Sequence, residues 1–246
     1  MGQKIQPFKY RLGIINNWTS RWIPKNMSFK NQLEEDMVIR KIVEEKIGPA
    51  GIVKIEIERG TDNSFKIFIK AARPGLVIGR GGKGIEDLSK AVEVVLNKLF
   101  AKRKTKTPKF LVRLTVEELR RSETSAQYVA QSLAWDMEKR MPYRRTMKKY
   151  IEGAMQDREV QGVKIRLSGR LDGNEIARRE WLAKGKLPLQ TLRANIDYGE
   201  ATSFNSYVTV GVKVWLYKGN VFANAPAKRN MEAFSVKDGS APGGKY

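Results

Sequence analysis

The sequence predicts an α+β protein with two successive domains, because apolar residues recur with a helical period in some segments and alternate with polar residues in others. The chain has 246 residues, long enough for two modest domains or one large one. Hydrophobic residues make up 41% of it, so it is not a disordered polycation. We expect an arm with a helix start, a first domain, a second domain and a flexible tail, at residues 1–37, 38–107, 108–218 and 219–246.

The chain is expected to begin with an extended, basic and aromatic arm, followed by a helix. Trp18 and Trp22 are four residues apart in the arm, and core packing of this pair is favoured over base stacking. The helix begins near Phe29 and ends at Gly48-Pro49. Its apolar stripe is expected at Leu33, Met37, Ile39 or Arg40, and Val43.

Alternation of apolar and polar residues predicts strands in both domains. The alternating segments are residues 52–58, 65–70, 163–167 and 208–216, of which the last is the clearest. A further strand at 110–114 follows a basic connector at 102–109. This strand either opens the second domain or completes the sheet of the first, and the pattern leaves both possibilities open.

Helical spacing of apolar residues predicts a second helix over residues 84–100. A third helix is expected from Ser122, a good N-cap residue, to Lys139. Pro142 interrupts the helical pattern there, and a fourth helix is expected to run to about Met155.

Charge and composition limit the classes of function. Lys and Arg number 47 against 26 Asp and Glu, a formal charge of +21, which makes nucleic acid the first candidate partner and an anionic membrane surface the second. No apolar run approaches the roughly 18 residues of a membrane-spanning helix, and no signal peptide is visible, so a cytoplasmic protein is expected. The chain has no Cys and no His, which excludes zinc fingers, thiolate nucleophiles and Ser-His pairs. Only lysine or carboxylate chemistry, or carboxylate-bound magnesium, would remain for an enzyme, and nothing beyond abundant Lys and scattered Asp and Glu supports it. We expect no enzyme, no cofactor and no metal site.

A glycine-rich segment after the 65–70 strand is the first candidate binding site. Residues Gly79, Arg80, Gly81, Gly82 and Lys83 match the GXXG loop with which a KH domain clamps about four nucleotides by their backbone. Glycine lets the sugar-phosphate chain approach the loop, and the two cations would add charge beside it. A dinucleotide-binding loop and a plain strand-to-helix turn are weaker alternatives, the former because the acidic residue expected about 20 positions later is replaced by a basic stretch.

A basic helix is the second candidate site. Within the expected fourth helix, Arg144, Arg145, Lys148 and Lys149 fall within roughly 140° of one another at 100° per residue. Such a cluster is usually a solvated basic face. Four like charges so close repel one another and lower helix stability, however, so the arrangement is easier to understand if contact with a polyanion offsets the repulsion.

Motifs spread from Met1 to about Gly219 resemble a known family. They include the start Met1-Gly2-Gln3-Lys4, then Arg73-Pro74-Gly75, Val77-Ile78-Gly79, Arg144-Arg145, Ser168-Gly169-Arg170-Leu171, Thr191-Leu192-Arg193-Ala194 and Ile196-Asp197-Tyr198. On these motifs the chain resembles the bacterial form of the universal KH-domain protein family of the small ribosomal subunit head, conventionally numbered three.

The resemblance implies a type II KH domain, then a second α/β domain with two helices on an antiparallel sheet. It implies a cytoplasmic, ribosome-bound structural protein whose partners are small-subunit rRNA, mRNA and neighbouring ribosomal proteins, with no membrane contact. Arg144, Arg145, Lys148 and the adjacent Lys149 would line the mRNA entry channel and help unwind incoming message. Candidate rRNA contacts are Lys4, Arg11, Arg170, Arg178, Arg179 and Arg193.

One loop position departs from the family pattern, and one alternative function stays open. The second variable position of the GXXG loop, often basic in the family, is Gly81, so phosphate pairing there would be weaker unless Lys83 substitutes. A free KH-type RNA-binding regulator or ribosome-assembly factor would need only residues 38–107. The block at 168–198 favours the ribosomal protein, because an autonomous KH reader does not need it.

Overall fold

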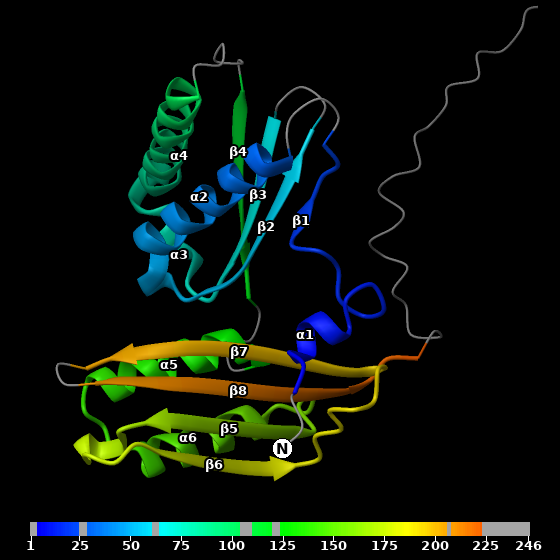
Figure 1. Ribbon diagram of the computed structural model, residues 1–246, viewed down its shortest axis with the longest axis vertical. Coiled ribbons are helices and arrows are strands. Elements are labelled where there is room, and N and C mark those ends of the chain that lie inside the picture. Colours follow the sequence, from blue (N-terminus) through cyan, green and yellow to red (C-terminus); the bar gives the residue numbers. More distant parts are fainter. Residues whose placement is uncertain are drawn as a thin grey trace, which may run out of the picture.

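The computed structural model describes residues 4–24, 29–60, 64–103, 110–119, 124–205 and 208–222. These residues form two domains, each with a four-stranded sheet that carries its helices on one face (Figure 1). The predicted α+β class is thereby confirmed.

The N-terminal domain packs its helices on a mixed sheet of order β1-β2-β3-β4. Strands β2 and β3 are antiparallel, whereas β4 runs parallel to β3. The elements in chain order are α2 (Phe29–Ile47), β2 (Ile52–Arg59), β3 (Ser64–Ala71), α3 (Pro74–Ile78), α4 (Lys83–Lys102) and β4 (Leu111–Glu118). The predicted helices and strands of this half are confirmed, and α3 is an addition to them.

Strand β4 belongs to the first sheet. It pairs with β3 along its full length, from Ser64 opposite Leu111 to Ala71 opposite Glu118. The strand therefore completes the sheet of the first domain and does not open the second domain. It adds to the edge of the first sheet at β3, and the second sheet is built without it. The domain boundary expected between residues 107 and 108 moves to the segment after Leu119.

Helix α2 buries a different stripe from the one expected. Ile39 and Val43 are fully buried, but Leu33 and Met37 are 45% and 65% exposed. Their place is taken by Glu35 and Asp36, which are buried against arginines rather than against apolar side chains. The apolar period alone could not reveal this, because it takes no account of ion pairs.

The C-terminal domain is an antiparallel sheet of order β6-β5-β8-β7 with both helices on one face (Figure 1). Its elements are α5 (Ala126–Glu138), α6 (Tyr143–Gln156), β5 (Gly162–Gly169), β6 (Arg178–Gly185), β7 (Ala194–Phe204) and β8 (Thr209–Asn220). This confirms the expected two helices on an antiparallel sheet. Helix α5 begins at Ala126, with Ser125 at the N-cap position, and the predicted cap Ser122 lies outside the described residues.

The N-terminal arm is more structured than expected and connects both domains. A short helix, α1 (Pro7–Tyr10), packs on the C-terminal domain, and β1 (Ser20–Arg21) adds a parallel strand beside β2. Trp18 is 65% exposed, whereas the indole Nε1 of Trp22 donates a hydrogen bond to Asp36 at 2.8 Å. The expected packing of the two tryptophans as a pair is therefore corrected.

The domains also touch directly through α5. The side-chain amide of Gln131 donates to the backbone oxygen of Ile52 at 3.0 Å, and Tyr128 lies against Gly51 so closely that a Cβ there would come within 2.9 Å of its ring. Beyond β8, residues 223–246 of the expected tail lie outside the described residues.

Candidate nucleic-acid interface

The glycine loop joins two helices, α3 and α4, rather than following a strand directly. Pro74 starts α3, where its fixed φ suits the first helical turn. Two glycines allow the helices to meet closely. A Cβ on Gly79 would lie 2.9 Å from the backbone nitrogen of Gly84, and a Cβ on Gly84 would lie 2.5 Å from the backbone oxygen of Val77. These positions need glycine for packing.

The other two glycines of the loop lie at its surface and are not needed for packing. Gly81 and Gly82 have φ of 64° and 80°, a region that L side chains rarely adopt, yet a Cβ on either would meet nothing within 4 Å. Arg80 and Lys83 are exposed on each side of them. The loop thus presents bare backbone between two cations at the N-terminus of the 20-residue α4, where helix dipole and N–H groups favour an anion.

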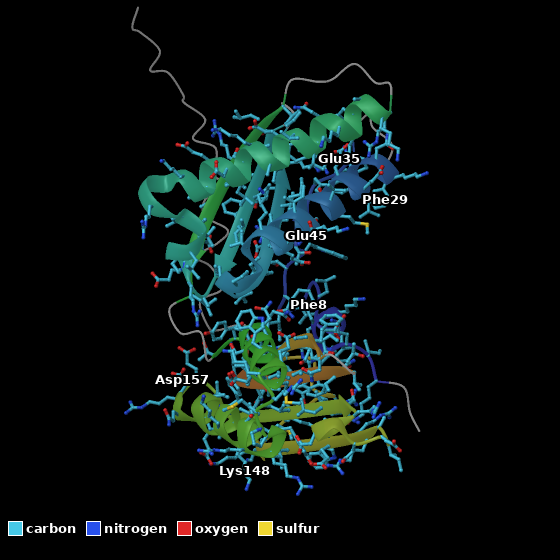
Figure 2. The ribbon with its side chains drawn as sticks, turned by 90° about the vertical axis from the view of Figure 1, so that its left-hand side faces the viewer. Phe8, Phe29, Glu35, Glu45, Lys148 and Asp157 are labelled. Carbon is cyan, nitrogen blue, oxygen red and sulfur yellow. The ribbon has the colours of Figure 1, made fainter. Side chains whose placement is uncertain are left out.

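Helix α6 has the two faces that its sequence predicts. Met147, Ile151 and Ala154 are buried in the core of the C-terminal domain, and all four cations of the helix are exposed. Figure 2 shows Lys148 at the end of the C-terminal domain that lies away from the N-terminal domain. We call the set Arg144, Arg145, Lys148 and Lys149 the basic face of α6.

One cation of the basic face has a carboxylate partner. The Arg144 guanidinium donates to Glu180 on β6 at 3.2 and 3.3 Å, and this bond is the main reason why the pKa of Glu180 is lowered. Tyr143 also donates to Glu180, at 2.7 Å. Within the described part of the chain, Arg145, Lys148 and Lys149 have no ion pair. Lys149 lies 5.7 Å from the centre of the Tyr150 ring.

The six candidate rRNA contacts occupy different environments. Arg11 is fully buried, and its guanidinium donates to the backbone oxygens of Leu189 and Thr191 at 2.9 and 2.8 Å. Its expected contact with rRNA is therefore corrected, because the group is inaccessible and holds the arm to the C-terminal domain. Lys4, Arg179 and Arg193 are exposed.

The remaining two candidates are engaged in local bonds. Arg178 donates to the Tyr143 hydroxyl at 2.9 Å and pairs with Glu180 at 3.2 Å. Arg170 donates through Nε to the backbone oxygen of Asn174 at 2.8 Å. These two side chains are therefore partnered within the protein, unlike the exposed Lys4, Arg179 and Arg193.

A further group of basic and aromatic residues escaped the sequence analysis. Lys164 and Arg166 alternate with the buried residues of β5, and the pairing of strands places Trp181 and Trp215 beside them. The alternation along β5 predicts that Lys164 and Arg166 lie on the same face of the strand. It does not reveal Trp181 and Trp215 as their neighbours, because these lie on β6 and β8, which pair with β5 only in the folded chain. No residues of β6 or β7 were identified by periodicity.

The described segments hold no cluster of three or more carboxylates suited to a metal ion. None of the helices in these segments is long and apolar enough to cross a membrane.

Two family models match the chain in agreement with this architecture. The model described as "KH domain" matches residues 38–124, and the model described as "Ribosomal protein S3, C-terminal domain" matches residues 133–216. The first match includes β4, in keeping with its place in the first sheet.

Curated proteins named "Small ribosomal subunit protein uS3" are similar to the chain over nearly its whole length. The protein of Desulfitobacterium hafniense is 44% identical over 229 residues, covering 93% of this chain and 96% of the relative. That of Pelotomaculum thermopropionicum is 40% identical over 245 residues, covering 100% of both. That of Alkaliphilus oremlandii is 43% identical over 221 residues, covering 90% and 87%. With the KH-type loop, the two-domain fold and this degree of identity, the chain belongs to the small ribosomal subunit protein uS3 family.

Proposed function

We propose that the chain is a structural, non-enzymatic component of the small ribosomal subunit in the cytoplasm. In this role it binds rRNA in the head, contacts neighbouring ribosomal proteins and lines the mRNA entry channel with the basic face of α6. The relatives cited above carry the name of a ribosomal protein.

The observation that carries the mRNA-handling part is the arrangement of charge on α6. Three of its four cations face solvent without a carboxylate partner among the described residues, on a helix whose other side is fixed in the core. Cations on a rigid helix can hold the phosphates of both strands of an incoming hairpin while translocation pulls one strand through. The helix makes and breaks no covalent bond, and the energy for unwinding comes from the ribosome's own cycle.

The glycine loop supplies a second RNA contact in this proposal. Its exposed backbone and the flanking Arg80 and Lys83 suit a sugar-phosphate chain. Because Gly81 carries no charge, Lys83 takes the role of the second cation.

The proposal is tested on ribosomes that contain the triple variant Arg144→Ala, Arg145→Ala and Lys148→Ala. Three exposed charge–phosphate contacts at roughly 0.5 kcal/mol each sum to ~1.5 kcal/mol, about tenfold. We therefore expect translation through a stable hairpin at the entry to slow by about that factor, with little change on unstructured messages.

A matched control removes three exposed lysines from α4 in the N-terminal domain: Lys90→Ala, Lys98→Ala and Lys102→Ala. It changes net charge equally and should leave the ratio of rates on the two messages unchanged. Equal slowing on structured and unstructured messages in the α6 variant contradicts the mRNA-handling role. Loss of the protein from small subunits when they sediment at high salt would instead support a loosely bound RNA-binding factor.

A further inference from the structure

The C-terminal sheet has one face that its helices leave uncovered. Helices α5 and α6 lie behind the sheet in Figure 1, packed on Val163, Ile165 and Leu167 of β5 and on their neighbours. The residues that alternate with these core residues lie on the other side of the sheet, which we call the open sheet face. They include Lys164 and Arg166 on β5, Arg179 and Trp181 on β6, Tyr198 on β7, and Lys213 and Trp215 on β8.

Strand register interleaves the cations and rings of this face. Arg166 lies between Trp181 on β6 and Lys213 on β8, and in the next row Trp215 lies between Lys164 and Tyr198. The Lys164 ammonium is 4.7 Å from the Trp181 ring centre and 6.0 Å from that of Trp215. Each indole is therefore accompanied by a cation, an arrangement that suits bases and phosphates together.

The charges of this face are poorly balanced. Among the described residues of the four strands, the only carboxylate on this side is Glu200, 3.7 Å from Lys213. The Nε of Arg166 is buried and has no hydrogen-bond partner among the described residues. Burial and, to a lesser extent, the neighbouring Lys4 and Arg166 lower the pKa of Lys164. An anion on this face would relieve the mutual repulsion of these cations.

The face is accessible at Trp181, whereas Trp215 is half-buried and packs beside Leu187 and Leu189. Trp181 is 59% exposed on the edge strand β6, a large ring with little apolar cover. The N-terminal arm crosses the other end of the sheet, so that Lys4, Gln6 and Tyr10 form one wall of a groove of about 670 Å³ whose floor includes Lys164, Arg166 and Trp215.

We propose that the open sheet face is a further RNA-binding surface, which takes single-stranded RNA by stacking a base on Trp181, with the half-buried Trp215 beside it, while Lys164, Arg166, Arg179 and Lys213 hold phosphates. It is separate from the basic face of α6, because that helix packs against the other side of the same sheet. A protein partner fits less well, since it would need carboxylates placed between aromatic contacts, whereas RNA carries both groups in every nucleotide.

The test uses the full chain with all four cations of the basic face of α6, and Arg80 and Lys83 of the glycine loop, replaced by alanine, so that binding at these two sites does not contribute. Binding of a fluorescent octauridylate is measured by anisotropy for Trp181→Leu, Trp181→Phe and the control Trp18→Leu, a similarly exposed indole on the arm. Loss of one base stack should weaken binding by about 5- to 150-fold for Trp181→Leu. Phe should retain affinity within about threefold, because its ring still stacks, and Trp18→Leu should leave binding unchanged.

An abasic octanucleotide of equal charge separates stacking from charge. It should bind equally to the protein that keeps Trp181 and to the Trp181→Leu variant, because it has no base to stack. Equal affinity of Trp181→Leu and Trp18→Leu for octauridylate would overturn the proposal. So would small subunits that lose a neighbouring protein with Trp181→Leu while octauridylate binding is unaffected, because the face would then hold a protein.

Discussion

Two arginine clusters in this molecule are used in opposite ways. In the N-terminal domain, Arg59 and Arg103 both bind Glu35, at 2.6 and 2.7 Å, and Arg59 also pairs with Asp36. These carboxylates are buried, and Figure 2 labels Glu35 on α2. On α6, by contrast, Arg145 and its neighbouring lysines point to solvent without an ion pair among the described residues.

The difference shows that a net charge of +21 does not locate an RNA surface by itself. Arginines that meet buried carboxylates are held in the fold, and breaking such pairs is costly because a charge is left without a partner in a low-dielectric environment. Arginines without carboxylates add a local positive potential that is available to phosphates. The location of the acidic residues therefore distinguishes structural from binding cations.

The largest expected effect comes from Glu35→Ala. It removes the carboxylate shared by Arg59 and Arg103, and we expect the unfolding free energy of the N-terminal domain to fall by about 3–5 kcal/mol. The measurement is urea unfolding, with hydrogen exchange in α2 to assign the transition to this domain.

The control is Glu45→Ala on the same helix. Glu45 is 64% exposed, and its pair with Lys41 spans 3.8 Å, so the change should stay within about 0.5 kcal/mol. If Glu35→Ala and Glu45→Ala cost the same, the buried cluster does not stabilise the fold and the contrast with α6 is lost.

Arg144 is intermediate between the two clusters, because it is exposed yet paired with Glu180. Hydrogen bonds from Arg144 and then Tyr143 lower the pKa of Glu180 in the folded state. The pair therefore contributes stability above the unfolded pKa of about 4.3 and loses it as pH falls through the lower folded value.

Glu180→Gln should reproduce the unpaired state at neutral pH. With Arg144 released, we expect affinity for single-stranded RNA to rise about two- to threefold and the pH dependence of binding near pH 4 to weaken. Glu159→Gln, at an exposed glutamate with no ion pair among the described residues, makes the same change in net charge and should have a smaller effect. An equal rise with Glu159→Gln would mean that only net charge matters.

Much of the fold could be predicted because its signals are local. Gly48-Pro49 ends α2, Pro142 separates α5 from α6, and the alternation of β8 depends only on adjacent residues. Strand β7 was missed because small residues interrupt its pattern. One is Gly199, where a Cβ would lie 2.3 Å from the backbone oxygen of Ala126 on α5. That requirement comes from packing between segments far apart in the chain.

In the candidate site, too, the features that depend on local sequence could be predicted and those that depend on distant residues could not. The basic face of α6 follows from helical geometry alone, so its exposure was predicted. The partners of Arg144 and Arg103 are 36 and 68 residues away, and the bonds of Arg11 reach residues almost 180 positions distant. No local pattern could have separated Arg11, buried against carbonyls, from the exposed Arg145.

The smallest expected effect tests the α6 side of the comparison. Arg145→Ala, Lys148→Ala and Lys149→Ala together remove cations that repel one another and make no ion pair among the described residues, and alanine favours helix. We therefore expect the unfolding free energy of the C-terminal domain to stay constant or rise by a few tenths of a kcal/mol per like-charged pair. Thermal unfolding at low and high salt measures it, and the gain should shrink at high salt because ions already screen the repulsion. A loss of stability comparable to that of Glu35→Ala would show that these cations support the fold, in which case their exposure is no guide to RNA binding.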